Sequence, residues 1–384
     1  MKKIVILLIS VLFVSGCYNY RELNELAIGS GLGLEFKDNE YHAYLQVINI
    51  NNFSTQTGSD KSNFNIYEAK GKTIFEAIRN INTTLSKEIF LSHMKIVVLD
   101  DSLFSDLEGV IDFLMNELEI SLNVPIVATT THNPKDILSI MPFNEEINGS
   151  EISNLVEINS VKKGLALSVT AKDFFTNYFD KGISNTLSVI SIEDEKNDEN
   201  SSEELNKSSE FTKININELI TFNKDKQLLL NENHSLILNL IKNNIENNVI
   251  SFSCGDKYFS VEVVKSKFNM DKFKNNKLHI NGDFSVLMAN YSCDYDLNET
   301  KSLNKIKKII TKNLNDKITE TFNYSKEQEV DFLGVGKFIK KSNKGYYQKY
   351  KHDWDKLGLK DINVDVDINV NLVKQGNLKG DIHG

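Results

Sequence analysis

The chain has 384 residues, of which 40% are hydrophobic and 25% are charged, and its formal net charge is −9. One hydrophobic core rarely serves so long a chain, so two or three domains are expected. The acidic balance excludes most nucleic-acid binding proteins, which carry a basic footprint, and it argues against electrostatic adsorption of the body to anionic lipid.

The N-terminus has the layout of a secretory signal. Two lysines precede an apolar run over residues 4–14, and small residues follow up to Gly16. The run has 11 residues, whereas a membrane-spanning helix needs about 20. We therefore expect residues 1–16 to be a signal peptide that is cleaved after Gly16, and we expect no spanning helix later in the chain.

The cysteine at position 17 indicates which kind of signal this is. Residues 14–17, Val-Ser-Gly-Cys, resemble the bacterial lipobox, in which two small residues precede the cysteine. The resemblance implies that Cys17 becomes the first residue and carries S-diacylglycerol and N-palmitoyl groups. A thiolate is a strong nucleophile, and two acyl chains hold a protein on a membrane where one chain binds only marginally. The alternative is a plain secretory signal with a chance cysteine.

Residues 26–50 predict a β-hairpin, in which a polar turn at residues 37–40 separates two strand-like runs. Gly29, Gly31 and Gly33 in the first run imitate a phosphate-binding fingerprint. That fingerprint follows a strand and opens a helix, whereas more strand-like residues follow Gly33. Close backbone packing or a β-bulge is therefore the favoured interpretation of these glycines.

Helical and strand-like patterns then alternate as far as residue 192. A polar stretch over residues 51–65 is expected to form a flexible loop. Thr73 and Glu76 match a capping box, and apolar residues at helical spacing follow them. The alternation favours some parallel strand pairing in this part. The predicted helices begin near residues 73, 106, 134 and 170, and the predicted strands cover residues 95–100, 125–130 and 186–192.

Residues 193–210 form an acidic segment between the two halves of the chain. It holds eight acidic residues and two lysines, with no aromatic or β-branched residue. Such a composition buries little apolar surface, so we expect a flexible linker. The chain is thereby divided into residues 17–192, with two α+β subdomains expected, and a C-terminal α+β domain over residues 211–384.

The second half predicts long strands and one long helix. A strand over residues 211–222 and a helix near Leu236 lead into this region. The pattern turns helical over residues 301–322, and Ser325 with Gln328 matches the start of a further helix. The whole chain is thus expected to be α+β, with mixed sheets and packed helices. Further strands, antiparallel in style, are predicted over residues 249–254, 258–268, 277–291 and 362–376.

The cysteines that remain beside Cys17 are Cys254 and Cys293. They could pair outside the cytoplasm, but bacterial surface proteins often lack disulfides, so two free, buried thiols are the favoured interpretation. Two cysteines alone do not form a zinc site.

The histidines and carboxylates show no catalytic pattern. The seven histidines lie outside metal-ligand spacing, and the chain lacks nucleophile-elbow, zinc-protease and Walker motifs. His93 is expected to bond the backbone locally rather than to act as an acid–base group. Asp353 and Asp355 flank Trp354, and we expect two solvated loop residues around a core anchor. Catalytic, cofactor-binding and metal-binding residues are therefore not assigned, and an enzyme is not expected.

Four stretches of the chain share residues with one protein family. The first is RELNELAIGSGLGLE, shortly after Cys17, and the second covers residues 69–103 with a Gly-x-Thr, a Glu-Ala pair and His93. The third stretch covers residues 329–357 and contributes Asp331, Gly334, Gly336 and Trp354. The fourth is the alternating C-terminal strand. Together they resemble the Ger(x)C family of spore germination lipoproteins, the C subunits of germinant receptors.

The resemblance implies a three-domain α+β architecture and a non-catalytic subunit anchored by lipid on the outer face of the spore inner membrane. It implies a role in nutrient-triggered germination, with integral-membrane A and B receptor subunits as partners and without nucleic acid or a cofactor. The alternative is a lipid-anchored extracytoplasmic solute-binding protein of a transporter. Such a protein needs two similar lobes around a hinge, and the unlike halves of this chain favour the receptor subunit.

Overall fold

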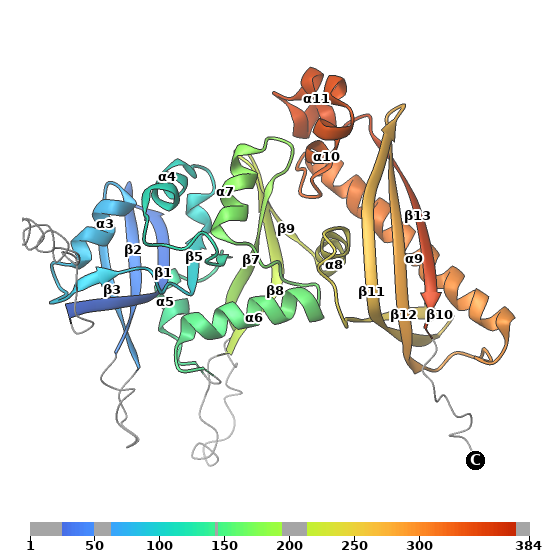
Figure 1. Ribbon diagram of the computed structural model, residues 1–384, viewed down its shortest axis with the longest axis horizontal. Coiled ribbons are helices and arrows are strands. Elements are labelled where there is room, and N and C mark those ends of the chain that lie inside the picture. Colours follow the sequence, from blue (N-terminus) through green and yellow to red (C-terminus); the bar gives the residue numbers. More distant parts are fainter. Residues whose placement is uncertain (1–24, 50–62, 143–144, 194–212, 374–384) are drawn as a thin grey trace, which may run out of the picture.

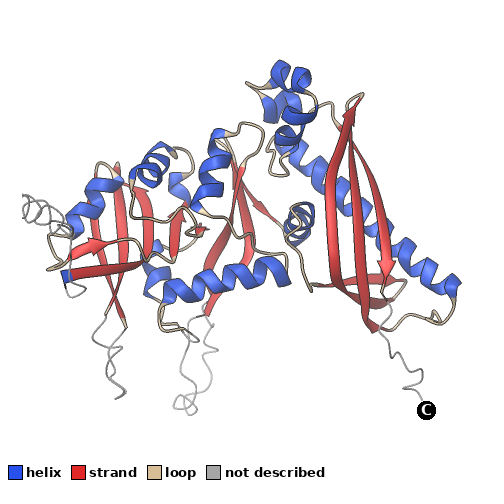
Figure 2. Cartoon of the chain, in the orientation of Figure 1, coloured by secondary structure: helices blue, strands red, loops and turns tan. Residues whose placement is uncertain are grey.

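The computed structural model describes residues 25–49, 63–142, 145–193 and 213–373. Two β-sheets of unequal size stand side by side, with helices packed on their faces and between them (Figure 1 and Figure 2). The expected α+β class with mixed sheets is confirmed. The predicted signal peptide, Gly16, Cys17 and most of the acidic segment lie outside the described residues.

The larger sheet is built from β1 (Leu26–Lys37), β2 (Glu40–Ile48), β3 (Phe64–Gly71), β4 (Glu88–Phe90), β5 (Ile96–Asp100), β6 (Ile126–Thr129), β7 (Asn185–Glu193), β8 (Lys213–Phe222) and β9 (Gln227–Leu230). These nine strands of the described residues follow the order β3-β2-β1-β5-β6-β7-β8-β9, with β4 beside β1. The centre, β1-β5-β6-β7, is parallel, which confirms the pairing expected from the helix–strand alternation. Both flanks are antiparallel.

The first hairpin shows how local sequence sets the geometry of this sheet. Asp38 and Asn39 connect β1 to β2 with φ angles of 52° and 61°, as a two-residue type I′ turn requires. The pairing of β1 with β2 also shifts register within the glycine-rich run, which is a bulge. A Cβ atom on Gly33 would collide with Pro134, so this glycine lets helix α5 (Pro134–Ser139) lie directly on the strand. Close packing and a bulge are both confirmed for the glycine-rich run.

The central strands are buried on both faces, because successive side chains of a strand point to opposite sides. On β5, Val97 and Leu99 lie in one core cluster with residues of helices α3 (Ile74–Ile81) and α4 (Glu108–Asn116). The neighbouring residues of β5 lie in a second cluster with residues of α5 and of helix α6 (Asn148–Lys162). Helices on each side therefore shield the sheet from water.

Two of the expected helix starts are confirmed by their caps. The Thr73 hydroxyl accepts a hydrogen bond from the Glu76 N–H at 3.1 Å, while the Glu76 carboxylate accepts from the Lys72 N–H at 2.7 Å. Thr170 and Asp173 form a reciprocal capping box at the start of α7 (Ala171–Phe179).

Helix α6 is absent from the sequence-based prediction. Its buried face includes Ile152 and Val156, but also Asn148, Gly149 and Ser160. Small and polar residues at these positions interrupt the apolar spacing by which a helix is recognised in a sequence.

The smaller sheet contains β10 (Val249–Cys254), β11 (Lys257–Lys274), β12 (Lys277–Tyr291) and β13 (Asn363–Leu372), in that order. The long helix α9 (Thr300–Gln328) runs along this sheet (Figure 1). Helix α8 (Glu232–Ile241) lies between the two sheets, and its Ile237, Leu238 and Leu240 belong to a core cluster that includes residues of both. One continuous core therefore joins the two sheets.

Strand β13 returns to the sheet after a long crossover. From β12 the chain passes through α9, α10 (Val335–Ser342), α11 (Lys344–Tyr350) and a π-helical turn, η3 (Trp354–Gly358), and β13 then pairs with β12 in parallel. The antiparallel style expected for the second half is confirmed for the pairs β8–β9, β10–β11 and β11–β12 and is wrong only for β13, whose parallel pairing needs a crossover connection of this kind. The helix start expected at Ser325 is also wrong. Helix α9 continues to Gln328, and the Ser325 hydroxyl donates to the Val330 carbonyl at 2.6 Å.

The acidic segment connects two neighbouring strands of one sheet. Strands β7 and β8 pair antiparallel, from Asn185 opposite Phe222 to Glu193 opposite Lys213. The larger sheet therefore continues through β8 and β9 into the half that the sequence analysis assigns to a C-terminal domain. Composition indicates where a chain does not pack, but it carries no information on which strands pair on either side. The domain division itself stays a prediction.

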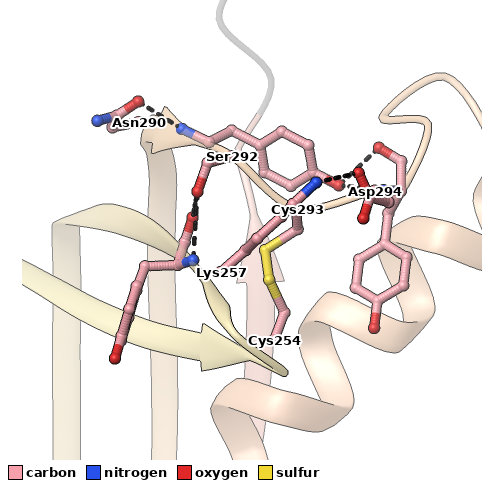
Figure 3. Close-up of a disulfide and its surroundings, with 9 residues drawn as sticks. Cys254, Lys257, Asn290, Ser292, Cys293 and Asp294 are labelled. Atoms are coloured by element: carbon pink, nitrogen blue, oxygen red, sulfur yellow. Dashed lines mark hydrogen bonds and ion pairs between the residues drawn. A yellow bond between two sulfur atoms is a disulfide. The ribbon is translucent and has the colours of Figure 1, made fainter.

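Cys254 and Cys293 form a disulfide, which corrects the expectation of free thiols. Their Cα atoms lie 6.2 Å apart, because the end of β10 and the end of β12 flank β11 at the same end of the smaller sheet (Figure 3). An ion pair between Lys257 and Asp294 lies beside the bridge. The proximity of the two thiols arises from strand pairing between segments 39 residues apart, which neither their spacing nor a general habit of bacterial surface proteins reveals.

Replacing both bridging cysteines by serine (Cys254→Ser with Cys293→Ser) should lower the free energy of unfolding by about 3–4 kcal/mol, because the disulfide restricts the unfolded chain. Denaturant unfolding of the oxidised wild type and the variant measures this loss. A reducing agent should destabilise the wild type to the same extent and leave the variant unchanged. Equal stability of all four samples would contradict a bridge between these residues.

Candidate functional site

The clearest cluster of polar groups lies where the chain leaves α9. Asp331 is fully buried, and its Oδ1 accepts from the backbone N–H of Gly334 at 2.8 Å and of Val335 at 2.9 Å. Its Oδ2 accepts from the Gly336 N–H at 2.7 Å and from the indole Nε1 of Trp354 at 2.8 Å. The carboxylate thus caps the first turn of α10 and holds the single tryptophan of the chain. We call Asp331, Gly334, Gly336 and Trp354 the Asp331 joint.

Two reversals of the backbone make this capping possible. Glu329, just after α9, has a φ of 56°, and Gly334, just before α10, has a φ of 78°. Both lie in the left-handed region, so the chain turns sharply on each side of Asp331. The N-terminus of a helix offers unpaired N–H groups and the positive end of the helix dipole, which suits a carboxylate.

Opposing influences act on the ionisation of Asp331. Burial raises the pKa of its carboxyl group and the hydrogen bond from Gly336 lowers it, and the balance of all influences leaves this pKa at about 7. The negative charge of Asp355 raises the same pKa, and the hydrogen bond from Trp354 lowers it. Above neutral pH the group is therefore a carboxylate, the form that can accept from all four N–H groups.

The joint connects the two sheets through backbone contacts. The Asp331 carbonyl accepts from the Ser184 N–H at 2.8 Å, and the Gly182 carbonyl accepts from the Lys337 N–H at 2.8 Å. A Cβ atom on Gly182 would collide with the backbone of Gly336, so the two segments touch without a side chain between them. Because residues 182 and 184 directly precede β7, the larger sheet is bonded to the start of α10.

Asp355 belongs to this cluster and is not the solvated loop residue that was expected. It is half-buried and accepts from the Asn223 side-chain amide at 3.0 Å and from the Asp331 N–H at 3.1 Å. Burial raises the pKa of Asp355, and the bond from Asn223 lowers it. Asn223 lies in the turn between β8 and β9, so a third segment meets here. Asp353 is exposed and Trp354 is 3% exposed, as expected.

The Asp331 joint connects parts of the fold and exposes no reactive group, since its carboxylate and its indole are both buried. In the described part of the chain no group of three or more His, Cys, Asp or Glu residues is arranged to hold a metal ion. Two surface hollows lie elsewhere, one of about 510 Å³ along α9 and β13, and one of about 260 Å³ at the tip of the β11–β12 hairpin. Both belong to the smaller sheet and its helix.

The other residues singled out from the sequence lie apart from the joint. Cys17 and Gly16 fall outside the described residues. His93 is exposed just before β5, and its ring lies 5.8 Å from that of Phe90, centroid to centroid. The Asp-x-x-Gly-x-Gly pattern and the single tryptophan were the only signals of the joint. Gly182 and Asn223 were missed because no local motif marks residues that meet only through folding.

Comparison with known proteins finds relatives over nearly the whole chain. Residues 19–192 match the family described as "Spore germination protein N-terminal domain", and residues 217–376 match "Spore germination B3/ GerAC like, C-terminal". Spore germination protein KC of Bacillus subtilis (strain 168) is 24% identical over 381 residues, which are 94% of this chain and 92% of that protein. Spore germination protein A3 of the same organism is 27% identical over 158 residues, 40% of each chain.

The crystal structure of the GerBC protein is similar in fold. It matches with a TM-score of 0.54 at 13% sequence identity, over 90% of this chain and 97% of that chain. This likeness bears on the fold alone, and it agrees with the α+β class described above.

The substitution Asp331→Asn should lower the free energy of unfolding by about 3 kcal/mol at pH 8, where the native carboxyl group is ionised. An amide presents one oxygen and one NH₂ group, so two of the four N–H donors would face another donor. Thermal or denaturant unfolding measures the loss. Asp353→Asn makes the same chemical change at an exposed site nearby and should alter stability by less than about 0.5 kcal/mol. Equal small effects of both substitutions would contradict the role of the carboxylate.

Proposed function

Because the chain belongs to the Ger(x)C family of spore germination proteins, we propose that it is the lipid-anchored, non-catalytic C subunit of a germinant receptor. In this role it assembles with integral-membrane A and B subunits and acts in nutrient-triggered germination. The observation that carries the proposal is the pair of family matches, which together span both halves of the chain.

In this proposal the anchor is lipid on Cys17, at the outer face of the spore inner membrane. The lipobox-like residues 14–17 support it. Leu26, the first residue of β1, is the ninth residue after Cys17, so the folded body lies within roughly 30 Å of the bilayer surface.

None of the helices in residues 25–373, as far as these are described, is long and apolar enough to cross a bilayer. The disulfide between Cys254 and Cys293 supports a site outside the cytoplasm, because such bridges form and persist in oxidising surroundings.

The alternative, a solute-binding protein, is less well supported. Such proteins close two lobes around a ligand by bending a hinge. Here the described sheets have nine and four strands, so the two parts are unlike. A hinge between them would also have to break the bonds from Ser184 to Asp331 and from Lys337 to Gly182, together with the core around α8.

Protein extracted from spore membranes should begin at Cys17 and carry the mass of a diacylglycerol and an added acyl chain, measured by intact-mass spectrometry. Cys17→Ser should lack this mass and retain residues 1–16, because a hydroxyl group does not replace the thiolate in forming the thioether. The variant with Cys254→Ser and Cys293→Ser keeps Cys17 and should remain lipidated, which makes it the matched control. A mature N-terminus at another residue would refute this anchor.

Tagged wild-type protein, solubilised from spore membranes in mild detergent, should co-purify with polytopic membrane proteins that mass spectrometry identifies as receptor subunits. The same protein without any polytopic partner would count against the receptor role. Calorimetry of the purified protein with amino acids tests the alternative in parallel. Tight one-to-one binding would favour a solute-binding protein, whereas a receptor subunit of the scaffold type should show none.

A further inference from the structure

One end of the smaller sheet is strongly basic although the chain as a whole is acidic. Residues 271–279 and 335–361 together contain eleven lysines and four aspartates, a net charge of +7. With −9 for the whole chain, the remainder carries −16. We call residues 271–279 and 335–361 the basic end cap.

The two segments of the basic end cap form one surface. The tip of the β11–β12 hairpin lies against α11, where the rings of Phe273 and Tyr346 are 4.9 Å apart between centroids. The Asn363 N–H at the start of β13 donates to the Asn276 carbonyl in the hairpin turn at 2.9 Å. Figure 1 shows α10, α11 and the end of β11 gathered at the same end of the molecule.

The charges of this end face water. Most of its lysines are exposed, whereas the ring of Phe273 in the hairpin packs on that of Tyr346, which in turn packs on Tyr350. Lys340 pairs with Asp180 at 3.2 Å and Lys277 lies 3.6 Å from Asp365, so part of the positive charge is compensated. A hollow of about 260 Å³ at the hairpin tip is lined by Lys272, Lys274, Asn275, Lys277, His279 and Asn363. The lysines exposed at this end are Lys272, Lys274, Lys277, Lys340, Lys341, Lys344, Lys349, Lys356 and Lys360.

We propose that the basic end cap docks on the anionic phospholipid headgroups of the membrane that carries the protein, and thereby orients the folded body. The proposal rests on the proposed function, because the lipid anchor brings the body within reach of a bilayer. Salt screens charges beyond about 8 Å at physiological ionic strength, so a surface that touches the bilayer interacts through its local charge and not through the net charge of the chain. The rest of the chain carries −16 in total, so contact through the basic end cap is the orientation that the charge distribution favours most.

The residue types favour a lipid surface over a specific anionic ligand. All basic residues of the cap other than histidine are lysines, which are compact and mobile point charges, whereas a fixed carboxylate or phosphate is usually gripped by the planar fork of arginine. Half-buried Tyr350 and Leu357, which is 43% exposed, lie among these lysines. Lysines interspersed with tyrosine and an exposed aliphatic side chain are typical of proteins that rest on a membrane interface.

Lysine labelling of the full lipidated protein on vesicles tests the proposal. The protein is bound to vesicles of phosphatidylcholine alone, or of phosphatidylcholine and phosphatidylglycerol in equal parts, and is treated with a water-soluble amine-reactive ester at low salt. Labelling of Lys274, Lys344 and Lys356, measured by mass spectrometry, should fall about fivefold on the anionic vesicles and recover at high salt. Lys37 at the end of β1 and Lys87 just before β4, both exposed, should be labelled equally on both kinds of vesicle.

Charge reversal separates the cap from general electrostatics. Lys344→Glu with Lys349→Glu and Lys356→Glu should abolish the protection of Lys274. The control, Lys301→Glu with Lys305→Glu and Lys308→Glu, makes the same charge change on exposed residues at the other end of α9 and should preserve it.

Equal labelling of Lys274, Lys344 and Lys356 on both kinds of vesicle would overturn the proposal and leave an acidic protein surface as the partner of the cap. Failure of the protein to bind neutral vesicles would refute the lipid anchor instead. In that case the role of the cap is judged on the anionic vesicles alone, by whether Lys274, Lys344 and Lys356 are protected from labelling there at low salt and labelled at high salt.

Discussion

The buried carboxylate of Asp331 is the contact on which the arrangement of the two sheets depends. Four N–H groups converge on it, three from the start of α10 and one from Trp354, which lies 23 residues away in the sequence. A carboxylate is costly to bury unless its oxygens are bonded, so the loop after α9, the start of α10 and the tryptophan must come together as a unit. Through Ser184 and Gly182 the same loop is bonded to the larger sheet. The part of the crossover from α10 to β13 therefore starts from a fixed point.

The features that could be predicted from the sequence are those in which neighbouring residues decide the structure. The turn at Asp38 and Asn39 and the cap of α7 are of this kind, because the residues that bond or bend are within a few positions of one another. The bond between Asn223 and Asp355 joins residues 132 positions apart, and the disulfide joins residues 39 apart. Helix α6 could not be predicted for another reason. Polar and small residues occupy part of its buried face and interrupt the helical spacing of apolar residues. The family resemblance pointed to Asp331 and Trp354, but it did not say that they bond each other.

The net charge of the chain is likewise a poor guide to how one part of its surface behaves. It sums charges over surfaces that lie farther apart than salt screening allows them to act together. The long strands β11 and β12 place two different groups of side chains, a disulfide and a set of lysines, at opposite ends of one sheet. At one end the bridge between Cys254 and Cys293 closes the sheet, and at the other the hairpin tip meets α11 and gathers lysines. An acidic composition argues against adsorption of the whole body to anionic lipid, and it leaves open the adsorption of one end.

These constraints together limit how a protein of this kind could respond to its partners. A continuous core around α8 and the Asp331 joint hold the two sheets in one relation, so closure of one sheet on the other would require breaking buried bonds. Under the proposed anchor at Cys17, fewer than ten residues would separate the lipid from the start of β1, so rotation of the whole body about that point would be the motion that remains inexpensive. A basic end cap that rests on the bilayer would restrict that rotation. It follows from the proposed function that membrane subunits would meet a rigid surface at a fixed height and angle above the bilayer. A conformational change in these subunits would then tilt the whole body rather than open a cleft in it.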